Sequence, residues 1–158
     1  MKTELKDCLH HYLNTGLKVT FTDMFGEINV GKLDSYDSNM GCGVDDYYLD
    51  ITPHFLPMSA LTDPLEDGTT PIVELAKIAY PKTGQDAEFF DGRCYVAPNH
   101  NYYFSYEVSD NSFHCTWYDR SKCYVPNQLA LFEYLFSKHF NVFDLDESLW
   151  IDKRTDKL

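Results

Sequence analysis

The pattern of residues 102–118 limits the possible folds of this chain more than any other part of the sequence. Aromatic and apolar side chains alternate with polar ones on both sides of residues 109–112, which are Ser, Asp, Asn and Ser. These residue types favour turns, and alternation with a period of two is typical of strands that bury one face. The pattern therefore predicts an antiparallel hairpin whose register is well defined, because a slip of one residue would mix its two faces.

A turn centred on Asp110-Asn111 gives this hairpin a specific predicted register. On its apolar face the predicted pairs are Val108 with Phe113, Tyr106 with Cys115 and Phe104 with Trp117. On its polar face they are Glu107 with His114, Ser105 with Thr116 and Tyr103 with Tyr118. We interpret Glu107 and His114 as a surface cross-strand pair and not as an acid/base couple.

Three other segments show the apolar spacing of helices that bury one side. They are residues 4–14, 71–79 and 127–139. Their predicted N-terminal caps are Thr3, Thr70 and Asn127, since Thr and Asn side chains accept hydrogen bonds from the first free amides of a helix.

Shorter strands are expected elsewhere in the first third of the chain. Residues 19–21 and 28–30 alternate in polarity around a turn near Gly26, and residues 47–51 form a third candidate, whereas residues 34–46 are predicted to be a loop. No repeat or linker interrupts the sequence. We therefore predict one α+β domain over residues 1–158: a single compact domain with an antiparallel sheet and about three flanking helices.

The composition suits a folded domain and excludes several other classes of protein. The chain has 158 residues, of which 44% are hydrophobic and 16% aromatic. No apolar stretch approaches the roughly 20 residues that cross a bilayer, and the N-terminal residues lack the apolar core of a signal peptide. The five cysteines are unevenly spaced, so we expect free thiols in a reducing compartment.

The net charge of −12 restricts the choice of partners, because an acidic surface repels phosphate backbones. Between Lys32 and Lys77 there are nine acidic residues and no Lys or Arg. In the simpler interpretation these acidic residues only keep the protein soluble. In the more specific one they form a surface that docks on a basic partner protein. The candidate binding residues are Asp34, Asp37, Asp45, Asp46 and Asp50.

Metal and cofactor sites are not expected. The ligand-type residues of the second half are Cys94, His100, His114, Cys115 and Cys123. They lack the close pairing of structural zinc sites, and phosphate-binding loops are absent as well. The adjacent His10 and His11 are expected to diverge on their helix, one half-buried and one exposed.

No catalytic residue can be assigned from motifs. A nucleophilic Cys or Ser needs a nearby His and an orienting acid, and no GxSxG motif is present. Gly41-Cys42-Gly43 is the only glycine-framed cysteine. One interpretation is an exposed reactive thiol on a flexible loop; the favoured one is a tight turn with an incidental cysteine, because no Lys or Arg lies nearby in the sequence.

Three blocks of the sequence resemble a known family. They are residues 1–7 (MKTELKD), residues 56–62 (LPMSALT) and residues 126–143 (PNQLALFEYLFSKHFNVF), the last followed by Ile151-Asp152-Lys153. Together they resemble a family of short uncharacterised proteins of gut Bacteroidetes and their phages and prophages. The chain departs from this pattern at residues 144–146, where relatives often carry Gly-Leu. The resemblance implies a phage or mobile-element accessory protein that works in the cytoplasm of a bacterial host cell, but no catalytic residue.

The leading hypothesis is a non-enzymatic accessory protein that binds another protein. One version is an acidic inhibitor that occupies the basic groove of a nucleic-acid-binding host or defence protein. The alternatives are a small enzyme without a visible motif and a structural or assembly component of a phage. The sequence leaves the oligomeric state open.

Overall fold

The computed structural model describes residues 4–45, 47–96 and 101–155, which form two compact units. Unit 1 comprises residues 1–58 and 135–158, and unit 2 comprises residues 59–134. Both combine helical segments with β-strands, so the predicted α+β class is confirmed. The single domain over residues 1–158 stays a prediction, because compact units of this size occur both as domains and as parts of one domain.

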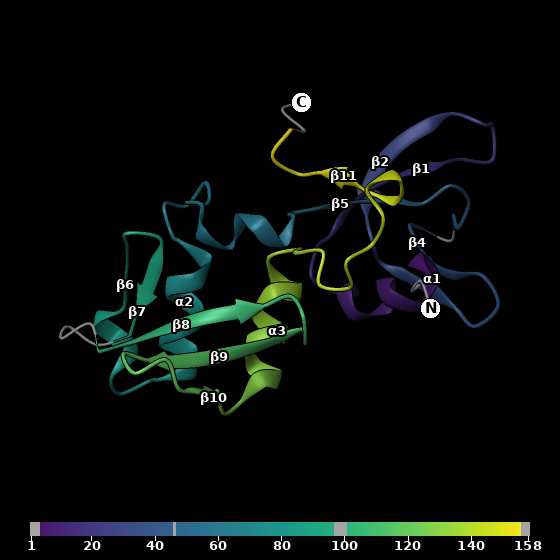
Figure 1. Cartoon of the computed structure of the whole chain (residues 1–158). Helices are drawn as coiled ribbons and strands as arrows, with labels where there is room; N and C mark the ends of the chain where they lie inside the picture. The colour runs from purple at the N-terminus through teal and green to yellow at the C-terminus, as the bar shows by residue number, and fades with distance from the viewer. Residues whose placement is uncertain (1–3, 46, 97–100, 156–158) are drawn as a thin grey trace. The chain divides into compact units, whose positions relative to one another are not determined.

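Unit 1 contains a four-stranded sheet in the order β11-β5-β1-β2 and a separate two-stranded hairpin (Figure 1). The sheet strands are β1 (Lys18–Thr22), β2 (Ile28–Lys32), β5 (Thr52–Phe55) and β11 (Ile151–Asp152), and the hairpin strands are β3 (Ser35–Asp37) and β4 (Gly41–Gly43). The short helical segments are α1 (Leu5–Cys8) and the 3₁₀ helices η1 (Leu9–Tyr12) and η4 (Glu147–Leu149).

The β1–β2 hairpin is the one predicted from the alternation around Gly26. Val19 pairs with Gly31 and Phe21 with Asn29, and Gly26 takes the left-handed conformation, with φ of 79°. Val19 and Phe21 are buried in the core of unit 1, so β1 uses its apolar face as the alternation predicts.

Two predictions for residues 34–51 are wrong. Residues 34–46 include β3 and β4, and the third strand is β5, which begins at Thr52. The turn of the small hairpin is closed by the Asp37 carboxylate, which accepts hydrogen bonds from the amides of Asn39 and Met40. Asp50 has a φ of 52°, in the left-handed region, so an extended strand could not continue through it.

The sheet of unit 1 is mixed, because β11 pairs with β5 in parallel while the other strand pairs are antiparallel. Parallel neighbours need a long connection. Here the chain between them includes the whole of unit 2. Pro53 is tolerated inside β5 because β11 pairs only with His54 and Phe55, which leaves Pro53 beyond its end.

The predicted helix over residues 4–14 is shorter and changes type within its length. α1 ends at Cys8 and the chain continues as η1 to Tyr12. The predicted cap Thr3 lies outside the described residues. Tyr12 is fully buried; its hydroxyl donates to the carbonyl of Phe140 at 2.5 Å and accepts the amide of Val142. This contact joins the N-terminal segment to the part of unit 1 that follows unit 2.

Unit 2 contains a five-stranded antiparallel sheet in the order β10-β9-β8-β7-β6. The strands are β6 (Glu88–Phe90), β7 (Arg93–Tyr95), β8 (Tyr102–Glu107), β9 (Ser112–Trp117) and β10 (Lys122–Tyr124). The helix α2 (Pro71–Ala79) and the 3₁₀ helix η3 (Gly84–Asp86) also belong to it, while η2 (Met58–Thr62) and α3 (Gln128–Ser137) cross from one unit to the other.

The predicted helices over residues 71–79 and 127–139 are confirmed as α2 and α3, apart from the exact ends of α3. In unit 2, Cys94 packs against the carbonyl of Ile72 in α2, and Phe113 packs against Phe132 in α3. Both contacts are on the same face of the sheet, which these helices cover (Figure 1). Thr70 precedes α2 as predicted, although its side chain makes no capping hydrogen bond.

The hairpin of β8 and β9 is confirmed, but its predicted register is wrong by two residues. The actual pairs are Tyr102 with Trp117, Phe104 with Cys115, Tyr106 with Phe113, Tyr103 with Thr116, Ser105 with His114 and Glu107 with Ser112. A shift of two residues keeps each side chain on its predicted face. The cause is a longer turn: Val108 leaves the ladder and becomes exposed, and Asn111 takes a left-handed φ of 50°.

Candidate functional site

The turn between β1 and β2 is held by one carboxylate. Asp23 accepts hydrogen bonds from the amides of Phe25 and Glu27, both at 2.9 Å, and from the side-chain amide of Asn29 at 2.8 Å. Asp side chains in turns often accept hydrogen bonds from backbone amides a few residues further along the chain. The turn is therefore well defined, and it presents Met24 and Phe25 at the tip of the hairpin.

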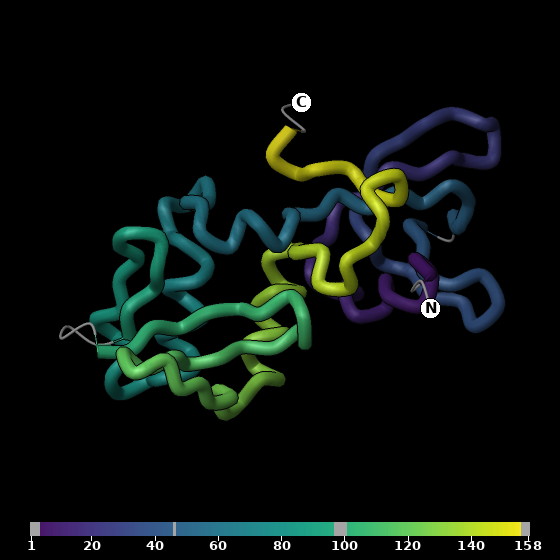
Figure 2. The backbone as a smooth tube through the Cα atoms, viewed as in Figure 1, coloured from purple at the N-terminus to yellow at the C-terminus, as the bar shows by residue number. Residues whose placement is uncertain are grey.

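Four large apolar side chains of this hairpin are exposed to solvent. The exposed fractions are 72% for Met24, 81% for Phe25, 77% for Ile28 and 59% for Val30. We call these four residues the hairpin patch. Clustered exposed apolar side chains are uncommon unless they mark an interaction site. The backbone tube in Figure 2 shows the hairpin extending from the rest of unit 1.

The hairpin patch is bordered by polar groups on the same face of the sheet. Ile28 pairs with Thr22, and Val30 pairs with Thr20. The hydroxyl of Thr22 donates to the carboxylate of Asp50 at 3.2 Å, which places one of the predicted binding residues beside Ile28. An apolar centre with a polar and charged border is the usual anatomy of a protein interface.

Of the other predicted binding residues, the structure joins two. Asp34 and Asp45 lie together because the Asp34 carboxylate accepts the backbone amide of Asp45 at 2.9 Å and the hydroxyl of Ser35 at 2.6 Å. These hydrogen bonds, that of Ser35 first, lower the pKa of Asp34. Asp37 instead binds the amides of the β3–β4 turn, which lower its pKa, and Asp46 lies outside the described residues. The four of these acids that the structure describes do not form one cluster.

The acidic character is shared by both units. Unit 1 carries 14 acidic against eight basic residues, and unit 2 carries 11 against five, so each has a net charge of −6. The nine acids between Lys32 and Lys77 are divided as well, with five in unit 1 and four in unit 2. The distribution of charge therefore does not identify a binding surface. The exposed apolar side chains of the hairpin patch do mark a candidate surface.

Sequence reasoning missed a Ser-His-Asp cluster at the β8–β9 turn. The hydroxyl of Ser112 lies 2.9 Å from Nε2 of His114, and the Asp110 carboxylate lies 3.0 Å from the same nitrogen. In a nucleophilic triad the serine and the acid bind opposite ring nitrogens. Here both bind one nitrogen, and Ser112 donates its proton to Asp110 at 2.6 Å. This arrangement stabilises the turn and does not activate Ser112. The predicted pairing of His114 with Glu107 is wrong.

A second histidine was not recognised as important from the sequence. His139 is buried, with Nε2 lying 3.0 Å from the carbonyl oxygen of Thr15 and Nδ1 lying 3.0 Å from Nζ of Lys153. A neutral ring satisfies both contacts, since Nε2–H donates to the carbonyl and Nδ1 accepts from the ammonium group. Burial, followed by the charge of Lys153, lowers the pKa of His139 to about 4. The SKHF and IDK segments of the family resemblance meet at this contact.

The remaining candidate residues have structural surroundings. Cys42 is buried on β4, so the interpretation as an exposed loop thiol is wrong, and burial raises its pKa. Gly43 is required there because a Cβ would lie 2.3 Å from the carbonyl of Tyr47. His10 and His11 are both exposed, with ring centroids 4.0 Å apart, so the prediction that they diverge, one half-buried and one exposed, is wrong.

Four of the five cysteines are buried, and Cys123 is exposed. All five are free thiols. Burial raises the pKa of Cys94 to about 12 and that of Cys8 to about 11, so these thiols are poor nucleophiles. Among residues 4–45, 47–96 and 101–155, no three His, Cys, Asp or Glu side chains are placed to hold a metal ion. His100, one of the ligand-type residues, lies outside these ranges.

The comparisons with known proteins add no constraint, since no family model, curated protein or solved structure matches the chain. Within the described part of the chain, no helix has the length and apolar character needed to span a membrane. A function must therefore be argued from the hairpin patch and its surroundings.

Proposed function

We propose that this chain acts by binding another protein and that the hairpin patch is its main contact surface. The observation that carries the proposal is the exposure of Met24, Phe25, Ile28 and Val30 on a hairpin whose turn is fixed by Asp23. Exposing these side chains to water is unfavourable by about 25 cal/mol for each Å² of apolar surface, and a partner that covers them recovers this free energy. A fixed turn reduces the entropy lost when the partner binds.

The charges near the patch indicate the kind of partner. Asp23 and Glu27 lie in the turn, Asp34 follows β2, and Asp50 is hydrogen-bonded beside Ile28. Together with the net charge of −6 on unit 1, these carboxylates favour a partner with basic residues around an apolar contact.

The family resemblance supplies the biological setting of the proposal. A phage or mobile-element accessory protein would work in the cytoplasm of its bacterial host. An acidic protein with an apolar contact surface would suit an inhibitor that occupies the basic groove of a nucleic-acid-binding host or defence protein. The geometry of Ser112, His114 and Asp110 gives the alternative of a small enzyme no support.

Capture from a bacterial lysate with matched variants tests this proposal. The full chain, the double variant Ile28→Thr/Val30→Thr and the control Val108→Thr are immobilised. Threonine keeps the β propensity of Ile28 and Val30, and Val108 is an exposed apolar residue outside the hairpin patch. We expect a host protein that the wild type and Val108→Thr retain, that the double variant loses, and that is released between about 50 mM and about 500 mM salt. Equal capture by the double variant would refute the proposal, and so would the absence of any protein that distinguishes it from the control.

A further inference from the structure

The strand β2 has a free edge, and the register of the hairpin shows which of its backbone groups point there. Leu33 donates its amide to Leu17 and Asp23 donates its amide to Glu27, so these two pairs are of the hydrogen-bonded type. In an antiparallel ladder such pairs alternate with pairs whose backbone groups point outwards. The N–H and C=O groups of Ile28, Val30 and Lys32 therefore point away from β1.

No described strand pairs with this edge. The sheet order of unit 1 ends at β2, and β1 is its only neighbour among the described strands. Ile28 and Val30 thus combine an unpaired backbone edge with exposed apolar side chains on one face. On the other face, Gly31 lies against Val44, because a Cβ at this glycine would lie 2.8 Å from a Val44 methyl group. Strand β2 therefore packs against Val44 on one face, while no described strand pairs with its outer edge.

We propose that an extended basic segment of the partner protein adds to β2 as a fifth, antiparallel strand of the unit-1 sheet. This inference rests on the proposed function and specifies how the partner binds. Main-chain hydrogen bonds would provide affinity, and alternating side chains would provide specificity: apolar ones against Ile28 and Val30, basic ones toward the carboxylates at the two ends of the strand.

The distribution of charge favours such a segment over a second copy of this chain. If two β2 strands paired antiparallel with Val30 opposite Val30, Gly26 of one copy would lie opposite Asp34 of the other. Glu27 of one copy would then lie opposite Leu33 of the other, between Lys32 and Asp34, so the charges at the two ends of the pair would largely cancel. A basic segment meets the carboxylates of Glu27 and Asp34 with opposite charge, so it gains an attraction that a second copy lacks.

Amide hydrogen exchange on the full chain tests the proposal with a defined probe. The probe is a short capped peptide in which lysine alternates with valine and isoleucine, added at about 1 mM, where even weak complexes form. We expect slower exchange for the amides of Ile28, Val30 and Lys32, while Asn29 and Gly31, which already donate to β1, change little. A peptide with glutamate in place of lysine should protect none of them.

Two variants at Val30 distinguish binding through the backbone of β2 from binding through its side chains. Val30→Pro removes the outward N–H but leaves the bonds to β1 in place, whereas Val30→Thr keeps the N–H and loses only apolar contact. Val30→Pro should therefore weaken peptide binding at least about threefold more than Val30→Thr does. The melting temperature shows whether Val30→Pro is folded. If this variant does not fold, the exchange pattern of the wild-type protein with the two peptides still tests strand addition.

Several results would overturn strand addition. They are no protection by the lysine peptide, equal protection by the glutamate peptide, equal binding by the two Val30 variants, and protection that rises with protein concentration alone, which would identify a second copy as the occupant. If the lysate partner is lost by Ile28→Thr/Val30→Thr but retained by Val30→Pro, protein binding stands and strand addition fails.

Discussion

The two long hairpins of this protein differ in how their outer edges are completed. In unit 2, β7 lies beside β8 and β10 lies beside β9, so both outer edges are paired. In unit 1, β5 lies beside β1, but no described strand lies beside β2. Both hairpins have turns fixed by an aspartate, Asp110 in one and Asp23 in the other. The difference therefore comes from the neighbouring strands and not from the turns.

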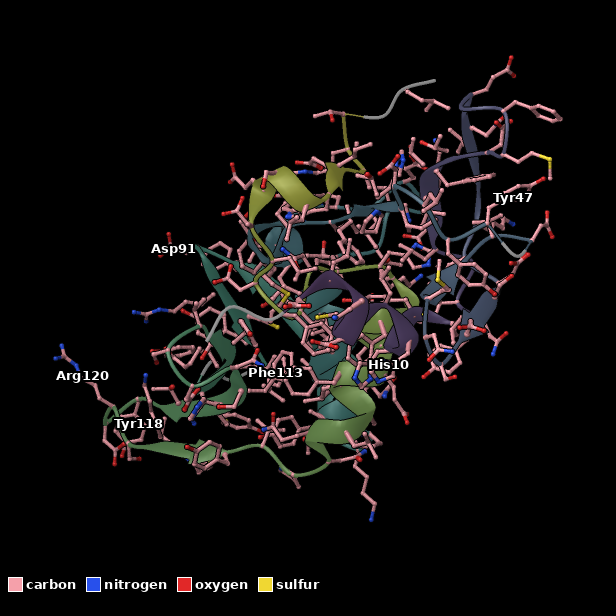
Figure 3. All side chains as sticks on the ribbon, turned by 90° about the vertical axis from the view of Figure 1, so that its right-hand side faces the viewer. His10, Tyr47, Asp91, Phe113, Tyr118 and Arg120 are labelled. Atoms are coloured by element: carbon pink, nitrogen blue, oxygen red, sulfur yellow. The ribbon has the colours of Figure 1, made fainter. Side chains whose placement is uncertain are left out.

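The two hairpins also differ in how far their apolar side chains are buried. Phe113 of β9 is fully buried and packs against Phe104, Tyr106 and Phe132, whereas Ile28 of β2 is exposed. Tyr118 and Arg120, by contrast, extend from the turn between β9 and β10 (Figure 3). Alternating sequence patterns thus predict which side chains share a face, but a face is buried only where a helix or loop covers it.

The largest expected effect is the loss of the buried ring in the completed hairpin. Phe113→Ala should lower the free energy of unfolding by about 3–5 kcal/mol, because it leaves a cavity between the sheet and α3. Ile28→Ala should change it by less than about 0.5 kcal/mol, because its side chain is exposed. Urea denaturation followed by the fluorescence of Trp117 in unit 2 and of Trp150 in unit 1 measures both. Similar losses for the two variants would contradict the comparison.

A second effect of similar size is confined to unit 1 and depends on pH. The pKa of His139 in the folded state is about 4, below the value of about 6.5 in an unfolded chain. The unfolded state then binds more protons between these values, so the stability is present above pH 6.5 and is lost as the pH falls toward 4. The loss should approach about 3 kcal/mol.

His139→Gln is the matched variant, since a glutamine side chain can still donate to Thr15 but does not titrate. Its unfolding free energy should change much less between pH 6.5 and 4.5 than that of the wild type. The same slope in both proteins would show that His139 is not the group responsible. Carboxylates with lowered pKa values, such as Asp34 and Asp37, lose their contribution only at lower pH.

Substitutions in the turns of the two hairpins should have smaller effects on stability, and these effects should be similar in the two turns. Gly26 and Asn111 both take the left-handed conformation, with φ of 79° and 50°. Alanine at either position should cost about 1 kcal/mol of stability. Asn111→Ala should cost somewhat more, because Asn111 also accepts a hydrogen bond from Tyr106. Thermal unfolding of the two variants tests this; a stabilising effect of either alanine would show that the turn changes its conformation.

The sequence predicted the parts of the fold that depend on local pattern. The helices α2 and α3, the strands β1 and β2, and the faces of β8 and β9 follow from apolar spacing. The hairpin register failed because two turns differing by two residues place the same side chains on the same face. The parallel strand β11 could not be predicted, because its pairing with β5 joins segments almost 100 residues apart, at positions 151 and 54.

The candidate site was harder to predict, for a physical reason. Ile28 and Val30 carried the correct strand pattern, but whether their face is covered depends on distant parts of the chain. The contact between His139 and Lys153 also joins separate segments. The acidic residues were visible in the sequence, but their hydrogen bonds to turn amides were not. The only available signal for the hairpin patch was apolar residues on a short hairpin close to several acids.

The smallest expected effect on stability concerns two of the predicted binding acids. Asp45 and Asp50 both have left-handed backbones, with φ of 46° and 52°, a conformation that Asn tolerates well. Asn at position 50 can still accept the long hydrogen bond from Thr22. The double variant Asp45→Asn/Asp50→Asn should therefore change the unfolding free energy by less than about 0.5 kcal/mol. A larger loss would show that these carboxylates are structural.

The same variant tests whether the acids near the hairpin patch attract a basic partner. Removing two negative charges should slow association of the lysine peptide at low salt and have less effect at high salt, because mobile ions screen exposed charges. Asp63→Asn/Glu66→Gln, which removes the same charge from unit 2, is the control. If both variants slow association equally, the attraction comes from the net charge of the whole chain. If only Asp45→Asn/Asp50→Asn does so, the carboxylates of unit 1 direct the partner to β2, and the open edge and the acidic surface belong to one binding site.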